Sequence, residues 1–339
     1  MKTVLDKSKI KKSVIFLCAA VLIAGIALSL QLIIGSFSSK LEFIHTGDRW
    51  SSDKSPYATI AMYTKQGEIS DWSLENWVYS IDNALLKASV TPKENAKSWI
   101  YSFSAEKDVS LTGPKSTVNA KTVIVRGDYF VFHPFKYTYG SSFLNDPSVP
   151  MGIVLDRNLA WKLFGAENII GMKLSVGDIE YTVVGISEPD GDSSAYNKVY
   201  GEIPRAYMSY AGYQKIDSSL MFTNFEVCLP NSVKGFAKNI FDSQVSVQEG
   251  NGIRSEVSSR FSLENRWEIL NNLKYSLISS NGIEFPYWEN EARIYDYYSA
   301  VILLLQIALL VIALISLIVS VVFFAKSGFS IKKIIKKNR

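Results

Sequence analysis

The sequence predicts an α+β domain, built of mixed sheet lobes with helices, between two transmembrane α-helices. Two uncharged apolar runs, Ser13 to Gly35 and Ser299 to Ala325, each exceed the about 20 apolar residues that cross a hydrocarbon core. Helix-like and strand-like patterns alternate between them. The expected parts are a cytoplasmic tail over 1–12, a first transmembrane helix over 13–35, an extracytoplasmic domain over 36–298, a second transmembrane helix over 299–325 and a basic cytoplasmic tail over 326–339.

Positive charge at both ends of the chain predicts its orientation. Five lysines precede the first apolar run, and six lysines and arginines follow the second. The positive-inside rule therefore places both termini in the cytoplasm. Segment 36–298 then lies outside, because long domains are translocated largely regardless of their charge.

The outer segment is mildly acidic, although the whole chain carries a formal charge of +4. The N-terminal tail contributes +4 and the C-terminal tail +6, so segment 36–298 carries −6. An acidic domain lacks the basic surface that nucleic acid requires. We therefore expect membrane lipid, and no nucleic acid, among the partners.

A secretory signal is the alternative interpretation of the first run. Ala27-Leu28-Ser29 has the small residues of a cleavage site. The apolar run nevertheless continues to Gly35, beyond the usual 7–15 residues of a signal, which favours a membrane helix. Cys18 lies in this run and Cys228 in the outer segment, so no disulfide is expected between them.

Segment 36–298 begins with a strand and a helix. Residues 55–65 are rich in strand-forming residues. Residues 71–89 place Leu74, Trp77 and Ile81 near helical spacing. A capping box over 91–94 predicts a second helix that continues through Phe103.

Later segments continue the alternation. Residues 121–132 have a strand-like composition on both sides of Gly127-Asp128, and residues 222–229 predict another strand. Residues 232–243 and 263–280 predict amphipathic helices.

The segment from Ile153 to Ile186 predicts a compact unit of strand, helix and hairpin. The helix ends at Gly165, where a left-handed cap is expected, and Phe164 should be buried beside it. The pair Gly177-Asp178 is typical of a tight hairpin turn. No reactive group stands out in this unit.

No catalytic constellation is found, so we expect no catalytic residue, no cofactor and no metal site. His45 and His133 have no second ligand at zinc spacing. The segment GPKS at 113–116 lacks the pattern of a P-loop. Residues 190–194 (DGDSS) lack the spacing of an EF-hand loop and are typical of a solvated turn.

Three consecutive motifs resemble one family. They are RGDYFVFHPFKYTYGSSFLND from Arg126, VPMGIVLDRNLAWKLFG from Val149 and NIIGMKLSVGDIEYTVVGI from Asn168. Their order and spacing resemble the extracytoplasmic core domain of MacB-type, FtsX-related permeases of ABC transporters. The residues that match its structural pattern include Gly127, Tyr129, Phe130, Gly140, Phe164, Gly165, Gly171, Val184 and Gly185.

The resemblance implies a subunit of a bacterial plasma-membrane transporter. Its partners would be a separate ABC ATPase subunit and a further permease subunit or a second copy of the chain. Such permeases have four spans, whereas the sequence shows two, which leaves open a split half-permease, a regulatory partner of a full permease or a truncated product. The basic tail after Ala325 is then a coupling segment for the ATPase or an anchor beside anionic lipid.

Two other classes of function remain open at this point. The first is a membrane-tethered binding, sensor or regulatory protein that keeps the fold without an ATPase. The second is an ectoenzyme, which is disfavoured because no set of catalytic residues is found in the sequence. Gln306 is the single glutamine of the second run, which carries no charge. It is either a contact to another helix or a residue tolerated near the outer interface.

Overall fold

The computed structural model describes residues 6–51, 54–91, 97–143, 151–188, 203–271 and 279–327. The chain divides into two compact units. The helical unit contains Met1–Lys40, Phe261–Leu273 and Tyr295–Arg339. The sheet unit contains Leu41–Arg260 and Lys274–Ile294.

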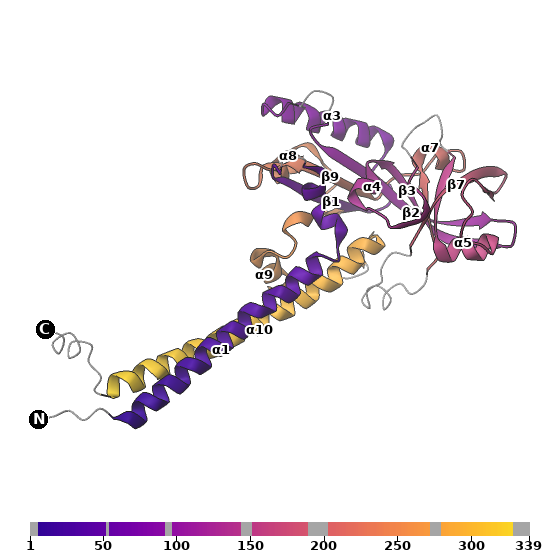
Figure 1. Cartoon of the computed structure of the whole chain (residues 1–339). Helices are drawn as coiled ribbons and strands as arrows, with labels where there is room; N and C mark the ends of the chain where they lie inside the picture. The colour runs from indigo at the N-terminus through magenta and orange to yellow at the C-terminus, as the bar shows by residue number, and fades with distance from the viewer. Residues whose placement is uncertain are drawn as a thin grey trace, which may run out of the picture. The chain divides into compact units, whose positions relative to one another are not determined.

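The helical unit is built on two long apolar helices. Helix α1 runs over Lys7–Ser38 and α10 over Tyr287–Lys326, and α10 contributes its residues from Tyr295 onward to this unit. The two helices lie side by side in Figure 1. The short helix α9, Leu263–Asn271, completes the unit. Both long helices extend beyond the apolar runs that the sequence predicted.

Buried and half-buried residues at seven-residue spacing on both long helices form a seam. Ser13, Ala20, Ala27 and Ile34 are buried on α1, and Ser299, Ala313 and Ser320 on α10. Small side chains allow two helix backbones to approach closely in a membrane. The seam therefore joins α1 and α10 along most of their length.

Hydrogen bonds join the two helices at one end of the seam and near its middle. The hydroxyl of Ser320 donates to the carbonyl oxygen of Ser13 over 2.8 Å. Further along, the amide nitrogen of Gln306 donates to the carbonyl oxygen of Ala27 over 3.1 Å. The two helices are thus antiparallel, with a register that stays constant.

Within the two apolar runs, most of the side chains outside the seam are apolar and exposed. In the described residues these two helices are long and apolar enough to cross a membrane. Only 17% and 11% of their most apolar windows are buried, so neither is the core helix of a globular fold.

A mixed sheet organises the sheet unit. Its strand order is β10-β1-β9-β2-β3-β8-β5-β7-β4, with β6 paired to β2 and β7. The pairs β3–β8 and β5–β7 are parallel, and the other pairs are antiparallel. The strands are β1 (Tyr57–Thr64), β2 (Ile100–Thr112), β3 (Thr117–Gly127), β4 (Tyr137–Gly140), β5 (Gly152–Asp156), β6 (Lys173–Val176), β7 (Ile179–Ser187), β8 (Arg205–Ser209), β9 (Asn224–Pro230) and β10 (Gly252–Glu256).

Helices cover both faces of this sheet, which explains why β1, β8 and β9 are buried almost throughout. On one face, α3 and α8 pack together and α5 contacts β3, β5 and β7 (Figure 1). The other face is covered by α2, α4 and the first turns of α10.

The helices of this unit are α2 (Thr46–Trp50), α3 (Asp71–Lys87), α4 (Tyr129–Phe132), α5 (Arg157–Phe164), α7 (Tyr210–Tyr213) and α8 (Phe236–Gln244). Two 3-10 turns are η1 (Glu42–His45) and η2 (Val257–Ser259). A separate two-stranded sheet pairs β11 (Ser279–Ser280) with β12 (Ile283–Glu284).

The strand, helix and hairpin expected over 153–186 are present as β5, α5, β6 and β7. The Asp156 carboxylate accepts a hydrogen bond from the backbone nitrogen of Leu159 and caps α5. The helix ends at Gly165 with φ +74°, the expected left-handed cap. Gly177, with φ +56°, begins the two-residue turn of the hairpin.

Three sequence expectations for local structure are wrong. Ile100–Phe103 belongs to β2 and not to a helix, because it pairs with β9 and buries alternate aromatic rings. Residues 129–132 form the helix α4 and not a strand. Residues 279–280 form a strand, so the helix expected over 263–280 ends at Asn271 in the described residues. The capping box at 91–94 lies largely outside them.

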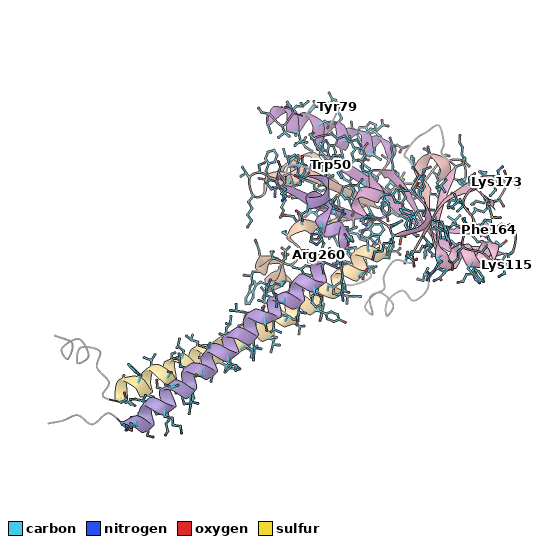
Figure 2. All side chains as sticks on the ribbon, in the orientation of Figure 1. Trp50, Tyr79, Lys115, Phe164, Lys173 and Arg260 are labelled. Atoms are coloured by element: carbon cyan, nitrogen blue, oxygen red, sulfur yellow. The ribbon has the colours of Figure 1, made fainter. Side chains whose placement is uncertain are left out.

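Phe164 is only partly buried, contrary to expectation. Its ring packs against the edge of the core at the end of α5 (Figure 2). Leu159, Ala160 and Leu163 are fully buried on the same helix. Leu159 and Leu163 therefore hold α5 on the sheet, and Phe164 packs at the edge of the core.

We predict that Leu163→Ala destabilises the protein by about 2–5 kcal/mol, because it leaves a cavity in a closed core. Phe164→Ala should cost less than the about 3–5 kcal/mol typical of a fully buried phenylalanine. Denaturant unfolding of the full chain in detergent gives both values. A larger loss for Phe164→Ala than for Leu163→Ala would contradict this assignment.

Candidate functional site

The glycines of the sequence motif allow two segments to approach closely. Gly140 on β4 lies directly opposite Gly185 on β7. A Cβ atom on Gly140 would overlap the carbonyl oxygen of Val184, and one on Gly185 would overlap that of Ser141. Gly140 also has φ +67°, which L side chains rarely adopt. These two glycines allow β4 and β7 to pair closely at the edge of the sheet, and they carry no reactive side chain.

The aromatic residues of the motif form a buried cluster on the second face of the sheet. The ring of Tyr129 lies 5.8 Å from that of Trp288 and 6.2 Å from that of Tyr207. Phe130 contacts Phe143 with ring centroids 5.0 Å apart. The cluster joins α4, β8 and the first turn of α10, so its role is packing.

His133 belongs to the same buried face. Its Nε2 atom lies 2.8 Å from Glu226 Oε2, and both side chains are almost fully buried. Its ring also packs 4.5 Å from that of Trp288. The structure thus shows His133 as a buried, packed residue. In the described residues no group of three His, Cys, Asp or Glu residues could hold a metal ion.

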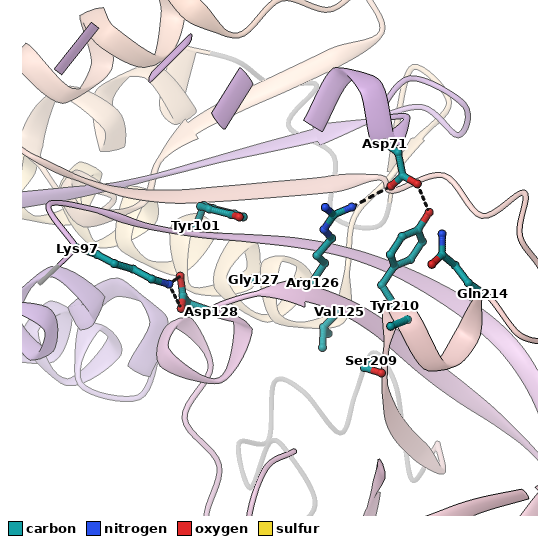
Figure 3. A pocket seen from close by; sticks show the side chains of 11 residues that line it. Asp71, Lys97, Tyr101, Val125, Arg126, Gly127, Asp128, Ser209, Tyr210 and Gln214 are labelled. Atoms are coloured by element: carbon teal, nitrogen blue, oxygen red, sulfur yellow. Dashed lines mark hydrogen bonds and ion pairs between the residues drawn. The ribbon is translucent and has the colours of Figure 1, made fainter. Parts of the chain in front are cut away.

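A pocket of about 480 Å³ opens where β3 ends, and it is the candidate binding site (Figure 3). Gly127, the last residue of β3, lies in its wall with φ +89°. A Cβ atom there would overlap the carbonyl oxygen of Tyr101 on β2. The volume falls within the range of small-molecule sites. The walls come from β2, β3 and the starts of α3 and α7: Asp71, Lys97, Tyr101, Val125, Arg126, Gly127, Asp128, Ser209, Tyr210, Ala211 and Gln214.

Two ion pairs give this pocket its charge. Arg126 Nη1 donates to Asp71 Oδ1 over 3.1 Å, and Lys97 Nζ donates to Asp128 Oδ1 over 2.8 Å. Tyr210 donates its hydroxyl to the second oxygen of Asp71 over 2.8 Å. The pocket thus presents two cations and two carboxylates, with no net formal charge.

Burial, together with the hydrogen bond to Asp71, raises the pKa of Tyr210 to about 12. The phenol therefore stays protonated at physiological pH and acts as a hydrogen-bond donor.

A buried carboxylate, Glu289, fixes the start of α10 to the sheet unit. Arg260 donates to both of its oxygens, over 2.9 and 2.7 Å. Arg293 Nε donates to Oε1 over 2.8 Å, and the hydroxyl of Tyr63 on β1 donates to Oε2 over 3.0 Å. Glu289 is fully buried and the two arginines nearly so. We call these four residues the Glu289 cluster.

The pKa of Glu289 reflects two opposing effects. Burial disfavours the charged form, but the charges of Arg260 and Arg293 and the hydrogen bonds outweigh burial and lower the pKa. Burial and the carboxylate together raise the pKa of Tyr63 well above its ordinary value. Glu289 is therefore ionised and Tyr63 neutral across the physiological range.

Sequence analysis found the motif residues but neither the pocket nor the Glu289 cluster. Of the nine pattern residues, Gly127 lines the pocket, and its neighbours in the first motif, Arg126 and Asp128, line it too. Gly171 has φ +82° in the turn before β6, and Val184 is half-buried on β7. Gln306 lies in the seam against Ala27 and also accepts a hydrogen bond from Arg266 over 3.3 Å. Residues 190–194 lie outside the described residues.

Comparison with known proteins places this architecture in one class. The family model described as "MacB-like periplasmic core domain" matches residues 17–233, more than half of the chain. The chain belongs to this family, the extracytoplasmic domain of MacB-type ABC transporter permeases, and two apolar helices flank the domain. No curated protein matches the chain.

Solved structures with detectable likeness are distant in sequence. The periplasmic region of MacB from Actinobacillus actinomycetemcomitans is 12% identical, with a TM-score of 0.42 over 61% of this chain and 92% of that one. The extracellular domain of the noncanonic ABC-type transporter YknZ from Gram-positive bacteria is 14% identical, with a TM-score of 0.40 over 58% of this chain and 99% of that one.

We predict that Glu289→Gln destabilises the full chain by about 3–5 kcal/mol at pH 7, because two buried arginines lose their counter-charge. The folded pKa of Glu289 is lowered, so its stabilisation is present above the unfolded pKa and disappears as pH falls through the folded pKa. The variant should therefore lose less stability than the parent on acidification below about pH 4.

Denaturant unfolding in detergent at several pH values measures both effects. Glu180→Gln is the matched control, since Glu180 pairs with Lys173 on the exposed surface and should change stability little. An acid response identical in the parent and in Glu289→Gln would refute the assignment.

Proposed function

We propose that the chain is a membrane subunit of an ABC-type permease system that couples a separate cytoplasmic ATPase to its extracytoplasmic domain, for export or for transmission of mechanical work. Membership of the MacB-like periplasmic core domain family, with an apolar helix on each side of the domain, carries this proposal. Its expected partner in the membrane is a further permease subunit or a second copy of the chain.

The contacts of α10 support such a coupling role. Its first turns are held by the Glu289 cluster, and the same unbroken helix continues to Lys326. The seam with α1 ties the two long helices together through Ser13, Ala27 and Gln306. Because α10 is one member of the helix pair, movement of the pair would load the contacts that the Glu289 cluster makes with the first turns of α10.

Affinity purification from native membranes tests this function. The tagged full chain, crosslinked before mild detergent extraction, should recover an ABC-type ATPase and a permease subunit or second copy. The purified assembly should hydrolyse ATP. Recovery of the chain alone under these conditions would contradict the proposal.

The proposed topology places both termini in the cytoplasm of a bacterial cell. We predict that Asp178→Cys, in the exposed turn between β6 and β7, reacts with a membrane-impermeant maleimide in whole cells. Ser8→Cys, at the exposed start of α1, should react only after the cells are opened. Cys18 and Cys228 are replaced in both variants. The reverse pattern of labelling would overturn the orientation.

The pocket at the end of β3 favours a second candidate function, that of a membrane-tethered binding or sensor protein. Its balanced charges suit a ligand that carries both an ammonium and a carboxylate, such as a short peptide with free termini. Arg126 and Lys97 would receive the carboxylate, and Asp71 and Asp128 the ammonium. The rings of Tyr101 and Tyr210 supply an aromatic wall.

Calorimetry with the full chain and a tripeptide tests this pocket. We expect the tripeptide with free termini to bind more tightly than its acetylated and amidated form. Arg126→Gln should weaken binding about tenfold, the effect of one lost charge-assisted hydrogen bond of about 1.5 kcal/mol. Equal affinity for the free and blocked peptides would contradict recognition of the charged termini by the pocket.

A further inference from the structure

Helix α9 exposes large apolar side chains, although it belongs to the helical unit. Leu263 is 66% exposed and Trp267 is 54% exposed. A spacing of four residues places both on one face, and Leu270 lies on the same face one turn later. Glu264 and Glu268 lie on a different face and are also exposed. The helix is therefore amphipathic, with an apolar face that the described residues of the chain do not cover.

Arg266 fixes the position of α9 along the helix pair. It is 2% exposed, and its Nη1 atom donates to Gln306 Oε1 over 3.3 Å. Gln306 lies seven residues into the apolar run that begins at Ser299, or about 10 Å along the helix. Because an arginine side chain is long, the backbone of α9 lies beside the first turns of this run.

Aromatic rings gather at the same end of the helical unit. Phe37 of α1 lies 5.0 Å from the ring of Tyr295 on α10 and 6.5 Å from that of Phe261, two residues before α9. Tyr298 packs against Phe37 and is 44% exposed. Lys40 lies over the ring of Tyr295. Tyrosine, tryptophan and lysine at the end of an apolar helix are typical of the membrane–water interface.

We propose that α9 is an interfacial helix, with Leu263 and Trp267 inserted into the headgroup region of the bilayer leaflet at this end of the spans. The proposal rests on α1 and α10 crossing the membrane, as the proposed function requires. Buried Arg266 then holds α9 on the helix pair from its inner side, and the glutamates face the aqueous side.

Lipid is the occupant that these contacts favour over a protein. The apolar face lies on the same unit as the spans, beside residues of interfacial composition. The exposed charges of α9 are acidic, so apolar insertion and not attraction to anionic lipid drives the contact. A bilayer of phosphatidylcholine is therefore sufficient.

Nitroxide probes on the full chain in phosphatidylcholine nanodiscs test the inference. Trp267→Cys and Glu268→Cys are adjacent exposed sites on the two faces of α9. Leu310→Cys, exposed in the second apolar run, is the lipid control, and Asp178→Cys is the water control. Cys18 and Cys228 are replaced throughout, and collision rates with oxygen and with a nickel chelate are measured.

We expect oxygen collisions to dominate at Trp267→Cys and Leu310→Cys, and nickel collisions to dominate at Glu268→Cys and Asp178→Cys. Nickel dominance at Trp267→Cys would place α9 in water and overturn the inference. Exclusion of both reagents there would indicate a protein partner and also overturn it. Nickel dominance at Leu310→Cys would instead refute the spans, so the two failures are distinguishable.

A second measurement avoids a label on α9. Brominated phosphatidylcholine should quench the tryptophan fluorescence of the parent chain, and Trp267→Phe should lose much of that quenching. Quenching that is unchanged in Trp267→Phe would overturn the inference, whatever the behaviour of the labelled variants.

Discussion

The ionised carboxylate of Glu289 is the constraint on which the sheet unit depends. It lies on the first turns of α10 and accepts hydrogen bonds from β1 through Tyr63, from the segment after η2 through Arg260 and from its own helix through Arg293. Buried charges cost several kcal/mol each unless they are closely paired. The cluster therefore defines one position for the first turns of α10, residues 287–294, against the sheet, and any other position of these turns leaves a charge without its partner.

Around this cluster, the second face of the sheet is unusually polar for a buried surface. Glu226 meets His133, and Tyr207 shares a hydrogen bond with Tyr287. The first face is a continuous apolar core under α3, α5 and α8. The two faces of the sheet therefore contribute differently. Apolar packing stabilises the first face, and hydrogen bonds and ion pairs orient α4 and the first turns of α10 on the second.

The sequence predicted those parts whose signals are local. The apolar runs, the cap at Gly165 and the hairpin at Gly177 follow from hydrophobic length and from glycine conformation. Ile100–Phe103 was misassigned because its strand depends on pairing with β9, which lies far along the chain. The pocket and the Glu289 cluster were missed for the same reason: Asp71, Arg126 and Tyr210, or Tyr63 and Glu289, are brought together only by the fold.

The seven-residue seam between α1 and α10 limits how the two helices move. Ser13 meets Ser320 and Ala27 meets Gln306, so the same register holds over several turns. Sliding by one residue would set bulky side chains against the small ones, and only a step of a whole heptad, about 10.5 Å, would restore a similar match. Sliding of one helix along the other would therefore break the contacts of the seam. Tilting or rotation of the two helices together as one rigid pair preserves every contact.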